Sequence, residues 1–214
     1  MKSKIISIVV FVGLSYLIPL VGNSRLLFTP QVIILIFIAI VLFMTQPPFT
    51  LEDTQKNKTE DKLSVIGILL GCMLCQVFSV VEWAYFQDTP SFKLNYLTGL
   101  GLGLLLGGTV FRVWCIQTLG KYFTATVQTQ NQQRIITQGA YQIVRHPSYL
   151  GAYLAIVGSS VLLQAFYGIV VSVVIMFAAY FYRIKVEEEA LVKTFGREYL
   201  EYQQRTKRMI PFIY

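Results

Sequence analysis

The stretch YQIVRHPSYLGAYL, residues 141–154, joins a polar segment to an apolar one. Arg145, His146 and Pro147 lie side by side at this junction, and His146 is the only histidine of the chain. The apolar residues beyond them approach the roughly 20 residues that a membrane-spanning helix needs. Pro147 suits the first turn of such a helix, where a backbone N–H has no helical partner. The stretch therefore predicts a helix that begins at a polar threshold and continues into a membrane.

The rest of the chain has the same apolar character. Of its 214 residues, 55% are hydrophobic and 14% are charged, whereas about 25% of the residues in a soluble domain are charged. Six apolar blocks account for the difference, at residues 5–21, 31–45, 63–83, 96–119, 148–163 and 166–183. We predict an all-α, polytopic membrane helix bundle with about six transmembrane helices. Because the second and fifth blocks are short, five spans is the alternative count.

The distribution of positive charge predicts how the bundle is oriented. If the N-terminus is cytoplasmic and all six blocks cross, every Lys and Arg except Arg25 and Lys93 falls on the cytoplasmic side. The excess of basic residues in the cytoplasmic loops of membrane proteins favours this orientation, with both termini cytoplasmic. The net charge of +7 then reflects topology and affinity for anionic lipids. The sequence shows no solvated basic face, so we predict the lipid bilayer as a partner and no nucleic acid.

Breaks in the apolar pattern divide the chain into three parts. Residues 1–46 predict an N-terminal transmembrane hairpin, residues 47–62 a cytoplasmic loop, and residues 63–214 a membrane core with an amphipathic C-terminal tail. Within the core, residues 120–147 form a long polar connection that we expect to cap the cytoplasmic ends of the helices. Gly196 predicts a break within the helical tail.

Two motifs inside the apolar blocks have structural interpretations. Cys72 and Cys75 form a CxxC pair, but no second pair or nearby histidine completes a metal site, so we predict no metal. Gly99, Gly103 and Gly107 recur every four residues. Glycines at this spacing fall on one face of a helix, where they let a second helix approach closely. We therefore expect these three glycines to form a helix–helix contact.

Two groups of residues are candidates for chemistry at the cytoplasmic end. The Arg145-His146-Pro147 sequence begins a helix, and free backbone N–H groups at a helix N-terminus can hold a carboxylate or phosphate. Arg183 and Glu187 are four residues apart, so they share one face of a helix that continues beyond the last apolar block. Side chains that snorkel to lipid headgroups and a surface ion pair are the structural alternatives. Since an apolar hairpin separates the two groups and returns the chain to the same side, we expect them to line one cavity.

From about residue 120 to residue 214 the chain resembles the isoprenylcysteine carboxyl methyltransferase family, which is related to the phospholipid N-methyltransferases. The residues that carry the resemblance are GAYQIVRHPSYLG (139–151), RIKVEEEALVKTFGREYLEY (183–202) and IPFIY (210–214). The resemblance implies an integral membrane enzyme that takes a methyl group from S-adenosyl-L-methionine, bound in a cytoplasmic cap. The implied acceptor is the carboxylate of a prenylcysteine-like or other lipidic molecule that enters from the bilayer.

The resemblance also assigns roles to individual residues. It implies that Arg183 meets the acceptor carboxylate and that Glu187 holds the cationic end of the cofactor. The implied cofactor contacts are Gln128, Gln133, Arg134, Ile135, Ile136, Tyr141, His146, Pro147, Ser148, Tyr149 and Glu187. No residue is implied as a general base, because a carboxylate acceptor is already a nucleophile.

Three other functions stay open on the sequence. N-methylation of a lipid amine would need a neutral amine, and a guanidinium at Arg183 disfavours that reaction. A non-catalytic membrane protein of the same fold would not need the Glu187, His146 and Tyr149 side chains that the chain carries. Sterol reductases have a similar arginine–proline–tyrosine turn, but no strand followed by a glycine-rich nicotinamide-binding loop occurs here.

Overall fold

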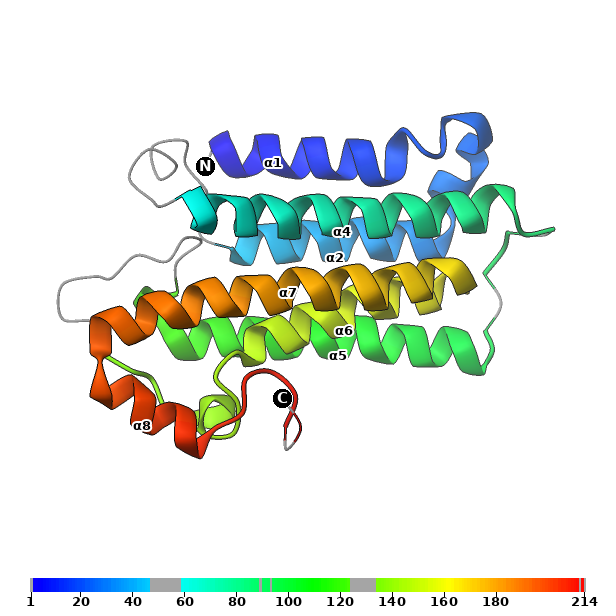
Figure 1. Ribbon diagram of the computed structural model, residues 1–214. Coiled ribbons are helices and arrows are strands. Elements are labelled where there is room, and N and C mark those ends of the chain that lie inside the picture. The colour runs from blue at the N-terminus through cyan, green and yellow to red at the C-terminus, as the bar shows by residue number, and fades with distance from the viewer. Residues whose placement is uncertain are drawn as a thin grey trace.

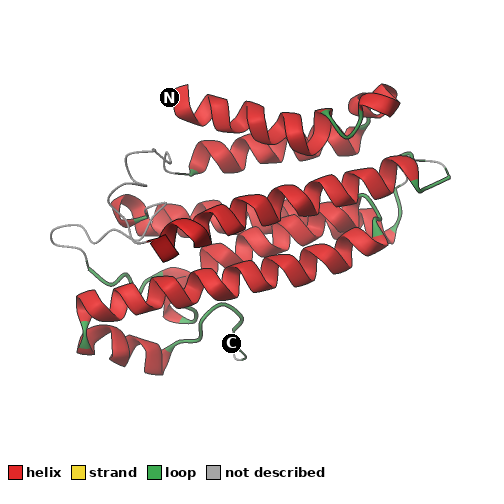
Figure 2. Cartoon of the chain, turned by 45° about the horizontal axis from the view of Figure 1, so that its top comes forward, coloured by secondary structure: helices red, strands yellow, loops and turns green. Residues whose placement is uncertain are grey.

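The computed structural model describes residues 2–46, 59–88, 90–92, 94–123, 134–211 and 213. Throughout these residues the secondary structure is helical, without a β-strand (Figure 2). The principal helices are α1 (Lys2–Val12), α2 (Pro30–Thr45), α4 (Thr59–Tyr85), α5 (Tyr96–Leu119), α6 (Pro147–Leu162), α7 (Phe166–Phe195) and α8 (Arg197–Arg205). Shorter turns are the π-helical η1 (Gly13–Leu17) and the 3₁₀-helical η2 (Val21–Phe28), η3 (Gly120–Tyr122) and η4 (Gly139–Gln142). The predicted all-helical fold is confirmed.

The helices from α1 to α7 run side by side along one direction, and α8 folds back beneath one end of the bundle (Figure 1). Large apolar side chains stay exposed along their outer faces, such as those of Val9, Phe37, Leu74, Val110 and Val174. An extended apolar surface of this kind suits lipid, since soluble monomers rarely expose large apolar patches. Each predicted apolar block therefore forms a helix of the bundle.

The number of complete membrane crossings stays a prediction. Within the described residues, three segments are long and apolar enough to cross, namely Leu63–Tyr85, Tyr96–Tyr122 and Phe166–Phe195. The N-terminal segment Lys4–Leu17 is bent by 104° against Val21–Phe28, and the two together would make a fourth crossing. The helices α2 and α6 have 16 residues each, or about 24 Å at 1.5 Å per residue, which is shorter than the roughly 30 Å hydrocarbon core.

The N-terminal hairpin packs into the same core as the later helices. Leu20 and Val32 are fully buried in a cluster that also contains Trp83 of α4 and Leu162 of α6. The division into three parts at residues 46 and 62 stays a prediction, but one boundary changes: α4 begins at Thr59, so the last four residues of the predicted 47–62 loop are helical. The rest of that loop lies outside the described residues.

The α5–α6 contact uses glycines other than those predicted. A Cβ added at Gly99, Gly103 or Gly107 would meet nothing within 4 Å, so the expectation that this face packs is wrong. Added at Gly108, it would lie 2.6 Å from the carbonyl oxygen of Gly151, which brings the two backbones into direct contact. The backbones of α5 and α6 also come close at Gly101 of α5 and at Gly158 of α6. Two glycines seven residues apart on each helix thus form the interface, and the four-residue series faces outward.

The helix α7 is longer than a membrane crossing requires. Its 30 residues extend about 45 Å, so its last turns continue beyond a hydrocarbon core of about 30 Å. These turns carry Arg183 and Glu187 to the end of the bundle where α8 lies (Figure 1). Gly196, with φ +54°, separates α7 from α8, which confirms the predicted break.

At the opposite end of α7, the Glu82 carboxylate accepts hydrogen bonds from the backbone N–H groups of Tyr167 (3.1 Å) and Gly168 (2.7 Å). The N-terminus of a helix is a favourable place for a negative charge.

Candidate functional site

A cavity of about 460 Å³ lies between the N-terminal hairpin and helices α4 to α7. Most of its lining is apolar, and its charged side chains gather at the end where α6 begins and α7 leaves the bundle. Six residues predicted for the site line it together: Tyr141, His146, Ser148, Tyr149, Arg183 and Glu187. Pockets of 300–1,000 Å³ with a few convergent polar groups are typical of ligand sites.

The loop that precedes α6 is held by the C-terminal segment. The backbone N–H groups of Arg145 and His146 donate to the carbonyl oxygens of Lys207 and Arg208, each at 2.8 Å. The N–H of Lys207 donates in return to the carbonyl of Ile143 at 3.0 Å. Backbone hydrogen bonds between two extended segments fix their register. The Arg145-His146-Pro147 turn therefore has its position set by residues about sixty positions later in the chain.

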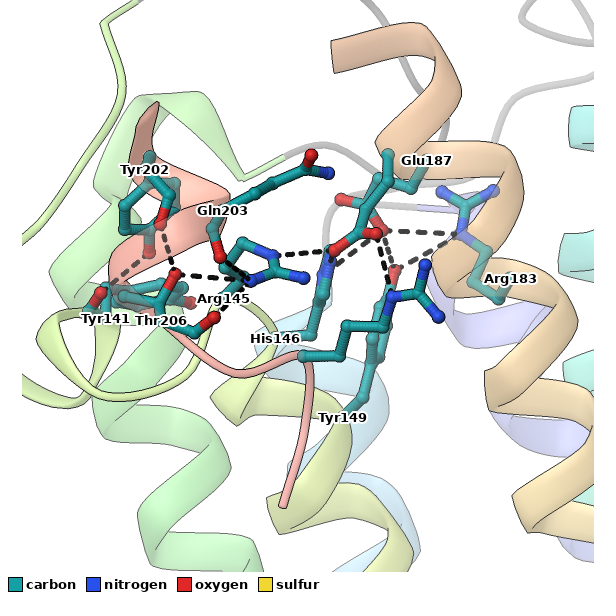
Figure 3. A network of polar contacts seen from close by, with 11 residues as sticks. Tyr141, Arg145, His146, Tyr149, Arg183, Glu187, Tyr202, Gln203 and Thr206 are labelled. Carbon is teal, nitrogen blue, oxygen red and sulfur yellow. Dashed lines mark hydrogen bonds and ion pairs between the residues drawn. The ribbon is translucent and has the colours of Figure 1, made fainter. Parts of the chain in front are cut away.

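Arg145 and Glu188 reinforce this attachment with charge. The Arg145 Nε lies 2.7 Å from Glu188 Oε1, and the Nε of Arg208 lies 3.0 Å from Glu188 Oε2. The same Arg145 guanidinium donates to the carbonyl oxygens of Gln203 and Thr206, as Figure 3 shows. The side chains of Arg145 and Glu188 are both more than nine-tenths buried, where ion pairs of good geometry are strong but leave a large penalty when one partner is lost.

Replacement of Glu188 by glutamine tests this attachment. We expect the variant to lose about 1.5–3 kcal/mol of stability, the usual cost of a hydrogen bond to a charged group. The measurement is thermal unfolding in detergent, together with limited proteolysis of the segment after α8. Replacement of Glu189 by glutamine is the matched control, because Glu189 is exposed on the same helix turn. Equal melting temperatures for the two variants would contradict the role given to Glu188.

Glu187 faces the cavity rather than the C-terminal segment. Its Oε2 accepts a 2.6 Å hydrogen bond from the Tyr149 hydroxyl and lies 3.9 Å from the Arg183 Nε. The Arg183 Nε also donates to the Tyr149 oxygen at 3.2 Å, and its Nη1 donates to the Ser64 hydroxyl at 2.9 Å. Figure 3 shows these side chains converging from α6 and α7. Among the described residues, Glu187 supplies the single carboxylate in the cavity lining, and its side chain is 26% exposed.

An aromatic stack forms one wall beside this carboxylate. The rings of His146 and Tyr149 are stacked at 5.7 Å between centroids, and those of Tyr149 and Tyr180 at 5.2 Å. The His146 Nδ1 lies 3.8 Å from Glu187 Oε2, and its buried Nε2 lies 3.4 Å from Glu188 Oε1 without a hydrogen bond. His146 thus lies between the two carboxylates, and its Nε2 makes no hydrogen bond.

Arg112 is a cationic residue to which no role was assigned from the sequence. It lies on α5, is buried, and lines the cavity. Its Nη1 donates to the carbonyl oxygen of Ser148 at 2.8 Å, which the close α5–α6 approach at Gly151 allows. No carboxylate within the described ranges forms an ion pair with it. A buried guanidinium that lacks a charged partner is costly, so Arg112 makes the cavity attractive to an anion.

Tyr141 closes the polar end of the cavity from the η4 turn. Burial raises the pKa of its phenol well above the usual value, so the group stays protonated and donates to the carbonyl of Cys115 at 3.3 Å. Its own carbonyl oxygen accepts a 2.6 Å hydrogen bond from the Tyr202 hydroxyl of α8. The turn is therefore held by α5 on one side and α8 on the other.

Four further predicted residues, all described, are not part of the cavity lining. Arg134 is exposed, Ile135 and Ile136 are half-buried, and Pro147 is fully buried as the first residue of α6. Gln128 and Gln133 lie outside the described residues. Their cofactor roles stay predictions. Within the described chain, no three His, Cys, Asp or Glu side chains gather as metal ligands.

The sequence is similar to proteins of one family. It matches the family model described as "Isoprenylcysteine carboxyl methyltransferase (ICMT) family" over residues 101–193. It is 31% identical over 181 residues to "Protein-S-isoprenylcysteine O-methyltransferase B" of Arabidopsis thaliana, covering 83% of this chain and 91% of that protein. It is 33% identical over 120 residues to "Probable protein-S-isoprenylcysteine O-methyltransferase" of Oryza sativa subsp. indica, covering 55% of this chain and 63% of the relative.

A solved structure shares the fold. It is the eukaryotic intramembrane Ras methyltransferase ICMT, with a TM-score of 0.63 and 24% sequence identity over 95% of this chain and 74% of that one. This shared fold and the long apolar helices together make the chain a multi-pass membrane protein.

Proposed function

Because the chain belongs to the isoprenylcysteine carboxyl methyltransferase family, we propose that it methylates the carboxylate of a prenylcysteine-like or other lipidic acceptor. We propose S-adenosyl-L-methionine as the methyl donor. The observation that carries the proposal is the charge arrangement at the polar end of the cavity, above a mostly apolar interior. Among the described lining residues Glu187 is the one carboxylate, and it lies with the guanidinium groups of Arg112 and Arg183, while that of Arg145 is bound to Glu188.

The residues around Glu187 fit a cofactor with a positively charged sulfur. The Tyr149 hydroxyl fixes the Glu187 carboxylate, whose remaining exposure is toward the cavity. The stacked rings of His146 and Tyr149 offer a flat surface beside it, and faces of aromatic rings attract cations. When bound, the cofactor supplies a methyl group on a cationic sulfur. Glu187 holds this positive end, and the Nδ1 of His146, 3.8 Å from Glu187 Oε2, is a further polar contact.

Arg183 and Arg112 fit the acceptor carboxylate. Arg183 is held by Tyr149 and Ser64, so its guanidinium is fixed before an acceptor arrives. Arg112 lies across the cavity on α5 and forms no ion pair with a carboxylate of the described residues. Guanidinium groups bind carboxylates through paired, directional hydrogen bonds. We propose that the two arginines orient the acceptor carboxylate toward the cofactor side of the cavity.

The chemistry needs little beyond positioning. The acceptor carboxylate would bond to the methyl carbon as the carbon–sulfur bond broke and neutral S-adenosylhomocysteine left; the carboxylate has no proton to lose, so no general base is required. Opposite charges on donor and acceptor disappear during the transfer, and a dry cavity of low dielectric constant favours that charge cancellation over the separated ions. Alignment of two bound reactants can supply roughly 7–11 kcal/mol of the barrier reduction.

The apolar remainder of the cavity suits the tail of the acceptor. Four helices line it with apolar side chains, namely those of Phe11, Leu35, Ile68, Met73 and Ile156. Burial of hydrocarbon is favourable by about 25 cal/mol per Å². The outer helix faces are apolar as well, so a lipidic acceptor reaches the cavity from the bilayer. We propose that the polar end of the cavity and both termini face the cytoplasm, in keeping with the basic residues near it.

Calorimetric titration of the detergent-purified protein with S-adenosylhomocysteine tests the proposal first. We expect saturable binding of this nucleoside and none of NADPH, the control for a reductase. Incubation with methyl-labelled S-adenosylmethionine and N-acetyl-S-farnesylcysteine should then give an alkali-labile methyl ester. Folded protein that binds neither nucleoside, or binds NADPH alone, would overturn the methyltransferase proposal. Methylation of a phospholipid amine in place of the carboxylate would select the N-methyltransferase alternative.

A further inference from the structure

A second, smaller pocket lies at the end of the bundle opposite α8. It has a volume of about 180 Å³ and lies where α4 and α6 end, at the right-hand end of the bundle in Figure 1. Five of its eight lining residues are polar, namely Gln31, Gln87, Asp88, Ser91 and Gln164. The larger cavity has a mostly apolar lining. The small pocket therefore suits a polar ligand.

The amide nitrogens of two glutamines in this lining already have partners. The Nε2 of Gln87 donates to the backbone carbonyl oxygens of Leu163 (3.2 Å) and Gln164 (3.1 Å). The Nε2 of Gln164 donates to Asn95 Oδ1 at 3.3 Å and to the Thr98 hydroxyl at 3.1 Å. Hydrogen-bond partners decide which end of a side-chain amide is the nitrogen. The side-chain oxygens of both glutamines are therefore the ends that remain for a ligand.

Gln31 adds a buried oxygen that has no donor. Its side chain is 3% exposed, and its Oε1 accepts no hydrogen bond from any described residue. Buried polar groups in proteins almost always have a hydrogen-bond partner, and an exception calls for an explanation. Since Gln31 lines the pocket, a hydrogen-bond donor bound there explains it.

The pocket also favours positive charge. Asp88 supplies a carboxylate to the lining and forms no ion pair or hydrogen bond with another described residue. The helices α4 and α6 both end here, and the C-terminus of a helix carries partial negative charge. The N-termini of α5 and α7 at the same end have their own acceptors, Asn95 and Glu82. A ligand with one positive charge and several N–H groups matches this arrangement.

We propose that this pocket binds a primary ammonium group, held by the Asp88 carboxylate and the side-chain oxygens of Gln31, Gln87 and Gln164. An ammonium group has three donors and no acceptor. A water molecule takes up about 30 Å³, so the pocket has room for an ammonium together with a short carbon chain. The group comes from a lipid headgroup at the bilayer surface or from a free amine. The site is separate from that of Glu187, so this inference goes beyond the proposed function.

Two matched pairs of probes test the proposal. Ethanolamine and phosphatidylethanolamine carry a primary ammonium, whereas choline and phosphatidylcholine carry a quaternary one without N–H donors. We expect the primary amines to raise the melting temperature of the delipidated, detergent-purified protein and the quaternary ones to leave it unchanged. Tighter apparent binding of phosphatidylethanolamine than of ethanolamine assigns the ammonium to a lipid headgroup. Binding of ethanolamine that is equal or tighter assigns it to a soluble amine.

Three variants connect this response to the pocket. Asp88→Asn changes an exposed side chain, so the protein should fold and bind the primary amines about tenfold or more weakly, the scale of a hydrogen bond to a charged group. Gln31→Met should weaken binding as well, yet melt no lower than the parent without ligand, because it removes a buried unsatisfied oxygen. Glu189→Gln, a change on the exposed face of α7, should retain the full response.

Three results would overturn the proposal. The first is equal stabilisation of the parent by the primary and the quaternary amines. The second is a response to the primary amines that Asp88→Asn retains. The third is no response to any of the four amines, whether calcium chloride stabilises the parent, which would assign the pocket to a metal ion, or fails to, which would leave the pocket to water.

Discussion

Replacement of Glu187 by glutamine is expected to weaken S-adenosylmethionine binding and to lower kcat/KM about 10²–10⁴-fold. The reason is that Glu187 is the one described carboxylate in the cavity lining, and loss of one partner from a charge pair that the bound cofactor would shield from water costs roughly 3–5 kcal/mol. Glutamine retains an oxygen that can accept the hydrogen bond of the Tyr149 hydroxyl. The loss therefore comes from the charge rather than from a rearranged site.

Two comparisons sharpen this experiment. Glu189→Gln makes the same change on the exposed face of α7 and should leave both cofactor binding and turnover unaltered. Arg183→Met should lower turnover while S-adenosylhomocysteine affinity changes little, because Arg183 is assigned to the acceptor. Dissociation constants from calorimetry and initial rates of methyl ester formation give the two readouts. Near-parental cofactor affinity in Glu187→Gln would refute the cofactor assignment and leave the fold untouched.

Replacement of Gly151 by leucine is expected to prevent folding. A Cβ at this position would lie 2.8 Å from the backbone nitrogen of Arg112 and from the carbonyl oxygen of Gly108. Both are backbone atoms of α5, so a side chain cannot be accommodated without separation of α5 and α6. Separation would also remove the hydrogen bond from Arg112 to the Ser148 carbonyl.

The matched control is Gly103→Leu, which adds the same side chain to α5 where no atom lies within 4 Å. Leucine is the better helix former by roughly 0.5–1 kcal/mol, so this variant should fold at least as well as the parent. The fraction of monodisperse protein after detergent extraction, with its melting temperature, measures both. A Gly151→Leu protein that melts like the parent would show that the two helices are not packed this closely.

The helices of this fold were accessible to sequence reasoning because each apolar block is bounded by strong signals. The α5 helix spans residues 96–119 as predicted, and Gly196 separates α7 from α8. The sequence did not reveal which of the two glycine faces of α5 packs against α6. Gly99, Gly103 and Gly107 form the more regular series, yet Gly101 and Gly108 make the contact because α6 presents Gly151 and Gly158 at the same seven-residue spacing. Only the knowledge that α5 packs against α6 could have revealed this.

The site shows the same limit. Arg183 and Glu187 come together as their four-residue spacing predicted, since one helix carries both. The role of Glu188 was missed, because its partners Arg145 and Arg208 lie 43 and 20 residues away in sequence. The adjacent acidic residues 187–189 were a signal of a charged cluster, but nothing local distinguishes the carboxylate that faces the cavity from the one that binds the C-terminal segment.

The attachment of Arg145 to Thr206 also has a consequence in time. The two residues are 61 positions apart, and a ribosome that adds roughly 5–20 residues per second needs roughly 3–12 s to travel that distance. During this interval the α6–α7 hairpin is being synthesised, while the turn before it lacks the carbonyl oxygens that hold it. Ligands stabilise only the state that binds them. The cofactor can therefore protect the finished protein, but it cannot assist the insertion of the nascent chain into the membrane.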